Sequence, residues 1–250
     1  MESGPLLELA LFSIAAFAAA FVAGLAGFAF GLFAMAIWLH LLTPTQTAIL
    51  IMFYALIVQG YAVWKLRRAI KLKRLLPFVV GGLIGIPLGV ELLRIAPAAS
   101  MRTGIGVFMV AFSLYSLIKP AIAPVKGERP FADGSIGVLS GVIGGATGLA
   151  TILPTIWSTL RGWPKDEQRA VFQPVGVTLF LVMAVWLGST GTIDGASLRL
   201  FLIGLPAVLV GTWAGLRLYG RLDEAAFRKV VLVVLLLSGL ALSLPRLTAI

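Results

Sequence analysis

The sequence predicts an all-α fold, a polytopic transmembrane helical bundle of two inverted repeats, each with a glycine-broken helix or hairpin. The first observation behind this prediction is composition: 60% of the residues are hydrophobic and 12% are charged, whereas soluble domains carry about 25% charged residues. The second is a succession of apolar runs long enough to cross a bilayer. The third is a glycine pattern in the first half that returns in the second. Too little charge remains to cover a soluble domain.

Eight apolar runs cover most of the chain. Their residues are, in order, 6–42, 47–64, 75–93, 104–118, 134–160, 170–187, 198–216 and 230–244. A helix needs about 20 apolar residues to span the hydrocarbon core, so most of these runs fit one helix each. The runs 6–42 and 134–160 are longer and are interrupted by glycines, each of which costs about 1 kcal/mol relative to alanine in a helix interior. We therefore expect a broken helix, or two half-helices, in both of these runs.

The two interrupted runs also match each other. Segment 24–32 aligns with segment 141–149, glycine for glycine at three positions, and segment 85–89 aligns with segment 211–215. Small-residue patterns recur by chance in membrane helices, but several matches in the same order favour a duplication. The predicted organisation is a first transmembrane repeat at 1–118, a cytoplasmic linker at 119–133 and a second transmembrane repeat at 134–250.

The basic residues predict the topology. If each long run crosses once, Lys and Arg divide almost evenly between the two sides. If each makes two passes or returns as a hairpin, 16 of the 20 fall in four inner loops, residues 65–74, 119–133, 161–169 and 217–229. The positive-inside rule favours the second arrangement, with both termini outside. Each half then crosses an odd number of times, so the halves are inverted. Such repeats with interrupted helices are typical of secondary transporters, whose substrates bind near the midplane where the breaks meet.

The breaks are the first candidates for a binding site. A break exposes backbone N–H groups at the start of the next half-helix, and these donors and the helix dipole attract anions. Gln59 and Gln173 are polar residues in apolar helices, and Arg169 could draw an anion into an inner vestibule. The glycines are explained equally well by close helix packing, and an interfacial anchor is the simpler interpretation of Arg169. The predicted substrate-binding residues are Gly27, Phe28, Gly31, Gln59, Gly144, Thr147, Gly148, Thr151, Arg169 and Gln173.

Other classes of function find little support. The chain has no cysteine, no clustered metal ligands and no phosphate-binding loop pattern, so we expect neither a cofactor nor a metal. The only base for a nucleophilic Ser140 would be His40, which lies near a predicted membrane surface, so we expect no enzyme. The net charge of +10 resides in short loops, which indicates topology and contact with anionic lipid headgroups rather than nucleic acid. The N-terminus lacks the basic region of a secretory signal, so we expect it to be retained.

Three groups of residues carry a family resemblance. They are segment 23–32, segment 44–48 and the repeated glycine-rich segment with Pro154, and the closing segment 215–228 is similar. Together they resemble the TauE/SafE sulfite exporter family. The resemblance implies a small multi-pass transporter of the bacterial inner membrane for sulfite, sulfonates or related sulfur-containing anions, with export the usual assignment. Both termini would then be periplasmic.

The first break departs from the family pattern. It has Phe28 and Phe30 between its glycines, and Ile37 where Pro154 aligns in the second half. A more apolar first tip favours an organic sulfonate over sulfite.

Two other functions are compatible with these residues. One is a transporter of another small organic anion, and the other is a membrane scaffold subunit that transports nothing. For a transporter, the expected partners are a small anionic substrate and protons as a candidate coupling ion. An oligomer is compatible with every one of these interpretations.

Overall fold

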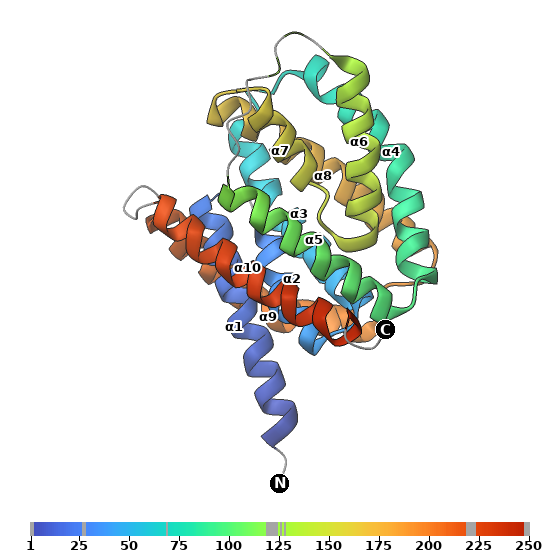
Figure 1. The fold of residues 1–250 in the computed structure, drawn as a ribbon, viewed down its shortest axis with the longest axis vertical. Coiled ribbons are helices and arrows are strands. Elements are labelled where there is room, and N and C mark those ends of the chain that lie inside the picture. Colours follow the sequence, from blue (N-terminus) through green and yellow to red (C-terminus); the bar gives the residue numbers. More distant parts are fainter. Residues whose placement is uncertain are drawn as a thin grey trace. The chain divides into compact units, whose positions relative to one another are not determined.

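The computed structural model describes residues 3–26, 29–68, 70–118, 125, 127, 129–218 and 224–247. In this part of the chain all regular structure is α-helical (Figure 1). The ten helices are α1 (Ser3–Ala26), α2 (Phe30–Leu41), α3 (Pro44–Leu66), α4 (Leu72–Ile95), α5 (Ala98–Ile118), α6 (Pro130–Thr147), α7 (Ile152–Leu160), α8 (Lys165–Ser189), α9 (Gly195–Leu218) and α10 (Glu224–Leu247). Among the described residues, six helices are long and apolar enough to span a membrane: α1, α3, α4, α5, α8 and α9. The predicted all-α membrane fold is confirmed.

Both long apolar runs are broken, as their glycines predict. The first is divided between α1 and α2, and Ala29, directly before α2, has a left-handed backbone with φ 79°. The second is divided between α6 and α7, and Gly148, directly after α6, has φ 79°. A left-handed residue turns the chain out of a right-handed helix, and glycine adopts that conformation without steric cost. Gly148 therefore accounts for the end of α6.

The two short helices return along the helices that precede them. α2 has 12 residues and α7 has 9, so they are about 18 and 14 Å long, too short for a hydrocarbon core of about 30 Å. The indole of Trp38 on α2 donates to the carbonyl oxygen of Phe12 on α1 at 3.3 Å. The indole of Trp157 on α7 donates to the carboxylate of Asp133 on α6 at 2.6 Å. Each long run is therefore a helical hairpin made of one longer and one shorter helix.

The chain forms two compact units, and each takes segments from both halves of the sequence. Unit 1 contains residues 1–47, 96–120 and 196–250, and unit 2 contains residues 48–95 and 121–195. Unit 1 therefore holds α1, α2, α5, nearly all of α9, and α10. Unit 2 holds α3 from Ala48 onward, with α4, α6, α7 and α8.

Glycines bring helices close together inside unit 1. A β-carbon on Gly24 of α1 would lie 2.8 Å from the carbonyl oxygen of Thr212 and 3.0 Å from Cα of Gly215, both on α9. A β-carbon on Gly106 of α5 would lie 2.8 Å from the carbonyl oxygen of Gly239 on α10. Such contacts are tighter than side chains allow, so the backbones approach because no β-carbon is present.

In unit 2, α4 packs directly against α6, and the two helices lie side by side in Figure 1. Gly85 and Gly89 of α4 face α6, where β-carbons on them would overlap the carbonyl oxygens of Val138 and Val142. A β-carbon on Gly141 of α6 would lie 2.9 Å from Cα of Gly85. Packing is therefore the role of the glycines that align between the two halves at these positions. In this contact, van der Waals attraction between backbone atoms replaces the side-chain packing of a soluble core.

Candidate functional site

The tip of the α6–α7 hairpin, residues 148–151, is held by its own polar groups. The N–H of Gly148 donates to the carbonyl oxygen of Gly144 at 2.6 Å. The hydroxyl of Thr147 donates to the carbonyl oxygen of Ile143 at 2.6 Å and accepts the N–H of Leu149 at 3.2 Å. The Thr147 hydroxyl therefore uses its only proton in a hydrogen bond at the end of α6. The predicted residues Gly144, Thr147 and Gly148 shape the tip.

A second set of contacts holds the tip against α6. The hydroxyl of the fully buried Ser140 donates to the carbonyl oxygen of Ala150. A β-carbon on Gly144 would lie 2.6 Å from Cβ of Ala150, so this glycine lets the tip lie against α6. The Ser140 proton is thereby committed to the backbone, in line with the expectation that Ser140 is no nucleophile.

The first turn of α7 offers hydrogen-bond donors. Thr151 is its N-cap residue and makes no side-chain capping bond. In the described part of the chain the N–H of Ile152 donates to the carbonyl oxygen of Leu149 at 3.3 Å, and that of Leu153 meets no acceptor. Pro154 has no N–H. Unsatisfied N–H groups and the positive end of the helix dipole together favour an anion at this place.

Gln59, Thr151 and Gly176 converge beside this first turn, from α3, the hairpin tip and α8. A β-carbon on Gly176 would overlap the methyl carbon of Thr151 and would lie 2.5 Å from Oε1 of Gln59. The absence of a side chain at 176 therefore lets the three segments meet. The Oε1 atom of Gln59 is buried and accepts no hydrogen bond from the described residues. Because half a turn of the amide exchanges its oxygen and nitrogen, Gln59 can offer N–H donors to a ligand.

The structure thus brings together two of the residues predicted from the sequence, Gln59 and Thr151, and adds Gly176. Gln173 lies on α8 one turn before Gly176 and is 5% exposed. Arg169 is half-buried and lies seven residues before Gly176, about 10 Å along the helix. In the sequence, Gly176 follows Gln173 by three residues, which places both on one helix face. For a single glycine, this spacing is weak evidence of a site.

The first break is described in part. Gly31 lies in the first turn of α2 in unit 1 and is half-buried. Gly27 and Phe28 lie outside the described residues.

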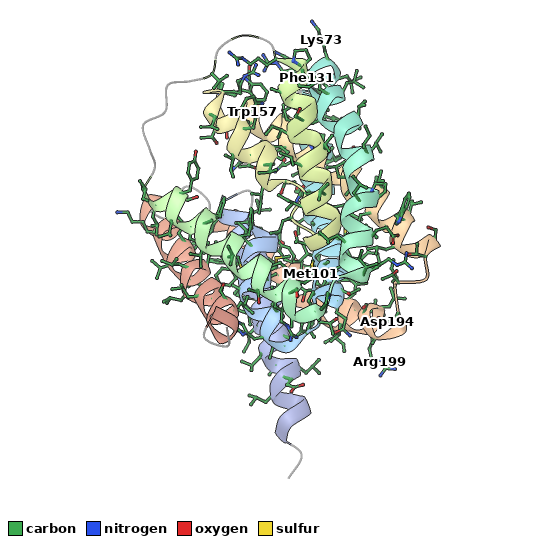
Figure 2. All side chains as sticks on the ribbon, turned by 45° about the vertical axis from the view of Figure 1, so that its right-hand side comes forward. Lys73, Met101, Phe131, Trp157, Asp194 and Arg199 are labelled. Atoms are coloured by element: carbon green, nitrogen blue, oxygen red, sulfur yellow. The ribbon has the colours of Figure 1, made fainter. Side chains whose placement is uncertain are left out.

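The base of the α6–α7 hairpin holds a group of charged and aromatic side chains. Arg161, just after α7, contacts Asp133 of α6 at 3.3 Å, and their side chains are only 7% and 12% exposed. The Arg161 guanidinium also lies 5.8 Å from the ring centre of Trp157 and 5.2 Å from that of Trp163. Trp157 and Phe131 are labelled at the same end of unit 2 in Figure 2. These contacts clamp the end of α7 to the start of α6.

A second ion pair joins α4 and α8 at this base. Nη1 of Arg74 lies 2.6 Å from Oε2 of Glu167, and the Arg74 guanidinium lies 5.2 Å from the ring centre of Trp163. Trp163 therefore contacts two guanidinium groups, those of Arg74 and Arg161. Cation–π contacts of this kind add to each ion pair where water is partly excluded.

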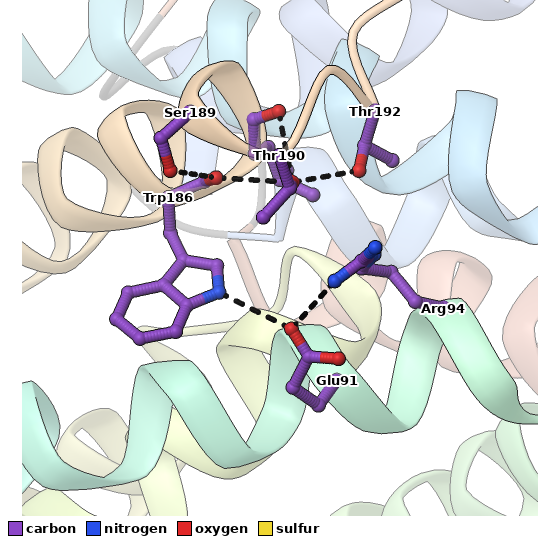
Figure 3. Close-up of polar contacts among 7 residues, drawn as sticks. Glu91, Arg94, Trp186, Ser189, Thr190 and Thr192 are labelled. Carbon is purple, nitrogen blue, oxygen red and sulfur yellow. Dashed lines mark hydrogen bonds and ion pairs between the residues drawn. The ribbon is translucent and has the colours of Figure 1, made fainter.

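Charged groups also gather at the other end of α4 and α8 (Figure 3). Oε1 of Glu91 accepts from Arg94 at 2.8 Å and from the indole of Trp186 at 3.4 Å. Beyond Trp186, the hydroxyl of Thr190 contacts that of Thr192 at 2.8 Å. These contacts tie the end of α4 to the end of α8, away from the first turn of α7.

The fold and this site define a class of protein. Helices long enough to span a membrane, two interrupted helical runs and polar donors at a helix break are features of multi-pass membrane transporters. Residues 12–242 match the family model described as Sulfite exporter TauE/SafE. The chain therefore belongs to the TauE/SafE sulfite exporter family, whose members are membrane transporters and not enzymes. No curated protein and no solved structure matches the chain.

Proposed function

We propose that this protein is a secondary transporter that exports small sulfur-containing anions, sulfite or organosulfonates, and binds them at the start of α7. The observation that carries the proposal is the convergence of Gln59 and Thr151 at this helix start, made close by Gly176. Family membership supports a small sulfur-containing anion as the substrate. The donors at the site match the negatively charged oxygens of such a ligand.

The chemistry of the site suits transport because neutral donors bind an anion only moderately tightly. Amide, hydroxyl and backbone donors bind an oxyanion by several hydrogen bonds of about 1 kcal/mol each. A bidentate arginine would bind more tightly and release more slowly. Backbone without helical hydrogen bonds persists at membrane depth only where protein or a water-filled cavity surrounds it. Leu149 and Ala150 in the break are almost fully buried, so the surrounding protein supports the non-helical backbone there.

We further propose that residues 1–118 and 134–250 are inverted repeats. Segment 24–32 of α1 aligns with segment 141–149 of α6, and segment 85–89 of α4 aligns with segment 211–215 of α9. In unit 2, α4 packs on α6 through glycines, and in unit 1, α9 packs on α1 through glycines. The alignment pairs α4 with α9 and α6 with α1, so the two glycine-packed helix pairs are equivalent. Each pair takes one helix from each half of the sequence. By this repeat, the first break, with Gly27, Phe28 and Gly31, would carry a second part of the substrate site.

The charge distribution supports an orientation with both termini in the periplasm. The basic loops would then face the cytoplasm, where anionic lipid is available to them. Exposed aromatic residues beside the loops agree with an interfacial position. The guanidinium of Arg67 lies 5.1 Å from the ring centre of Trp64, and that of Arg217 lies 4.4 Å from the ring centre of Trp213. The tryptophans are 62% and 57% exposed.

Flux through proteoliposomes tests the proposal. Purified protein is reconstituted, and movement of sulfite, taurine, sulfoacetate and thiosulfate is followed with and without a pH gradient. We expect movement of at least one of these anions, and a response to the gradient if protons are the coupling ion. Absence of movement for all four, together with absence of anion-dependent thermal stabilisation, would leave a scaffold subunit as the function. Movement of carboxylates instead would indicate a transporter of another organic anion.

Variants locate the site. Gln59→Leu and Thr151→Val remove the polar groups at nearly constant volume. We expect each to lower flux by about ten- to a hundredfold, because loss of a hydrogen bond to a charged ligand costs about 1.5–3 kcal/mol. Thr159→Val is the matched control, because the exposed hydroxyl of Thr159 lies on α7 one residue before its last and donates to the carbonyl oxygen of Thr155 at 2.9 Å. An equal loss of flux in all three variants would show that the start of α7 is not the binding site.

A further inference from the structure

Two aromatic rings and a guanidinium group lie together on the outer surface of unit 2, at the end of α3. The guanidinium of Arg67, just after the helix, lies 5.1 Å from the ring centre of Trp64. The ring of Tyr61, one turn earlier, stacks on that of Trp64 with the ring centres 6.3 Å apart. All three side chains are exposed. We refer to Tyr61, Trp64 and Arg67 as the α3 platform.

Arg67 differs in its partners from three other arginines of unit 2. Arg74, Arg94 and Arg161 each form an ion pair with a carboxylate of the same unit. Among the residues that the structure describes, Arg67 pairs with no carboxylate, and its contact is with the face of Trp64. Its N–H donors can therefore bind a ligand that brings its own negative charge.

Trp64 also differs from other tryptophans of the chain. The indole N–H groups of Trp38, Trp157 and Trp186 each donate to a protein oxygen. Within the described part of the chain, the indole N–H of Trp64 meets no protein acceptor. An exposed indole with a free N–H is typical of the membrane interface, where the ring contacts acyl chains and the N–H contacts polar groups.

The surface that follows the platform indicates its depth in the bilayer. Arg68 and Lys71, in the loop after α3, are exposed. Leu72, Leu76 and Val80 of α4 are also exposed and follow one another at about one-turn spacing, so an apolar face begins where the loop ends. Apolar faces lie in the hydrocarbon region and basic loops among the headgroups. The platform therefore lies at the level of the lipid phosphates.

Unit 1 repeats the pairing at the end of α9. The guanidinium of Arg217 lies 4.4 Å from the ring centre of Trp213, four residues earlier on the helix. Leu209, Val210 and Leu216 are exposed like Trp213. Both α3 and α9 are candidate membrane spans, and each pairing lies where its span ends. The recurrence indicates that the same environment surrounds the two pairs.

We propose that the α3 platform is a binding site for the headgroup of an anionic phospholipid. The Arg67 guanidinium binds the phosphate by two parallel N–H···O hydrogen bonds. The indole N–H of Trp64 donates to an ester oxygen of the lipid, and the rings of Tyr61 and Trp64 contact the start of an acyl chain. This inference does not depend on which solute the protein transports.

The neighbouring charges give the site its preference among phospholipids. Every phospholipid carries a phosphate, but phosphatidylcholine and phosphatidylethanolamine also carry a cationic group. Arg68 and Lys71 follow Arg67 in the loop and repel such a group, whereas they attract a headgroup of net negative charge. Phosphatidylglycerol is therefore the expected type of ligand.

Titration of the intact, delipidated protein in detergent tests the lipid preference. Binding of phosphatidylglycerol and phosphatidylcholine is measured by native mass spectrometry. We expect phosphatidylglycerol to bind about fivefold more tightly or better, the effect of one basic residue beside an anionic headgroup. Equal affinities overturn the inference. Neither lipid measurement involves transport, so the outcome is separate from that of the proposed function.

A soluble phosphate is the alternative ligand for the same donors. The midpoint of thermal unfolding is measured with phosphatidylglycerol and, separately, with inorganic phosphate. We expect phosphatidylglycerol to raise the midpoint and inorganic phosphate to leave it unchanged, because only the lipid offers an acyl chain to the two rings. An equal rise with inorganic phosphate assigns the site to a soluble anion and overturns the lipid inference.

Two arginine variants separate the platform from the general charge of the loop. Arg67→Gln and Arg68→Gln remove the same charge from adjacent exposed residues, but only Arg67 lies over the Trp64 ring among the described contacts. We expect Arg67→Gln to abolish most of the preference for phosphatidylglycerol and Arg68→Gln to keep the larger part of it. Thermal unfolding without lipid confirms that both variants are folded. An equal loss of preference in the two variants overturns the platform as a site.

Discussion

Arg161 at the end of α7 lies 3.3 Å from the carboxylate of Asp133 near the start of α6, and both side chains are almost fully buried. This pair closes the base of a hairpin whose tip holds the proposed site. The same carboxylate accepts from the indole of Trp157 at 2.6 Å, so Asp133 has two donors from α7 and its end. The tip is thereby supported on a fixed base.

Asp133→Asn and Arg161→Ala should both destabilise the protein strongly. Removing one partner of a buried ion pair leaves an uncompensated charge or dipole and costs about 3–5 kcal/mol. The matched control is Arg94→Ala, which breaks the pair with Glu91, where the side chains are 39% and 44% exposed. Exposed pairs contribute about 0–1 kcal/mol. Thermal unfolding in detergent measures the difference, and equal shifts for the buried and exposed pairs would contradict the clamp.

Gly85→Ala should destabilise the α4–α6 contact. Its new β-carbon would overlap the carbonyl oxygen of Val138, and backbone cannot yield as a flexible side chain does. We expect a loss of about 1–3 kcal/mol, as for overpacking of a close contact. Gly104→Ala on α5 meets nothing within 4 Å and should be stabilising by up to about 1 kcal/mol, because alanine favours the helix. Unfolding midpoints that move in the same direction would contradict this interpretation.

Gly176→Ala should lower the flux per folded molecule, and not only the amount of folded protein. The added methyl group would displace Thr151 and Gln59 together, and catalytic or binding groups displaced by about 1 Å lose about a hundredfold in rate in sensitive cases. Gly188→Ala lies on the same helix with nothing within 4 Å of its β-carbon and should leave flux unchanged. Flux per folded molecule decides the question. Equal flux in both variants would show that α8 does not position the site.

His40 should make the protein less stable in acid. It lies in the last turn of α2, outside the candidate spans, with Nε2 3.3 Å from the hydroxyl of Ser238. Burial and the positive charge of Arg102 lower the pKa of His40 below its ordinary value. The unfolded chain therefore binds this proton more readily, so stability falls as pH drops from about 6.5 through the lower folded value.

The measurement is the midpoint of thermal unfolding at about pH 7.5 and about pH 5. His40→Gln keeps an amide donor for Ser238 and cannot titrate, so its midpoint should fall less between the two pH values than that of the unaltered protein. An equal fall in both would assign the acid sensitivity to other groups.

Much of the architecture could be predicted from residue type and spacing. Glycine interruptions in two overlong apolar runs predicted two broken helices, which are the breaks before α2 and after α6. The loop charges could not distinguish double passes from hairpins, because both place the same residues inside. The lengths of α2 and α7 show that each broken run contains one helix too short to cross a bilayer by itself.

The roles of individual polar residues were harder to predict. Thr147 and Thr151 both flank the second break, yet the first hydroxyl is bonded to Ile143 and the second makes no capping bond. Spacing along the chain does not show which hydroxyl finds a backbone acceptor, because that depends on where the helix ends. Gly176 shows the same limit, since its role comes from α3 and the hairpin tip meeting at its Cα.

The sequence by itself determined that this protein is a multi-pass helical membrane protein of the TauE/SafE family, because hydropathy, charge and glycine spacing are local properties. Only the tertiary structure decided which glycines pack against helix backbone and which one packs against the side chains of Gln59 and Thr151. Gly85 and Gly176 look alike in sequence, but the first faces a helix backbone and the second faces Gln59 and Thr151. The physical reason is that a missing β-carbon has meaning only through the atoms that occupy its place.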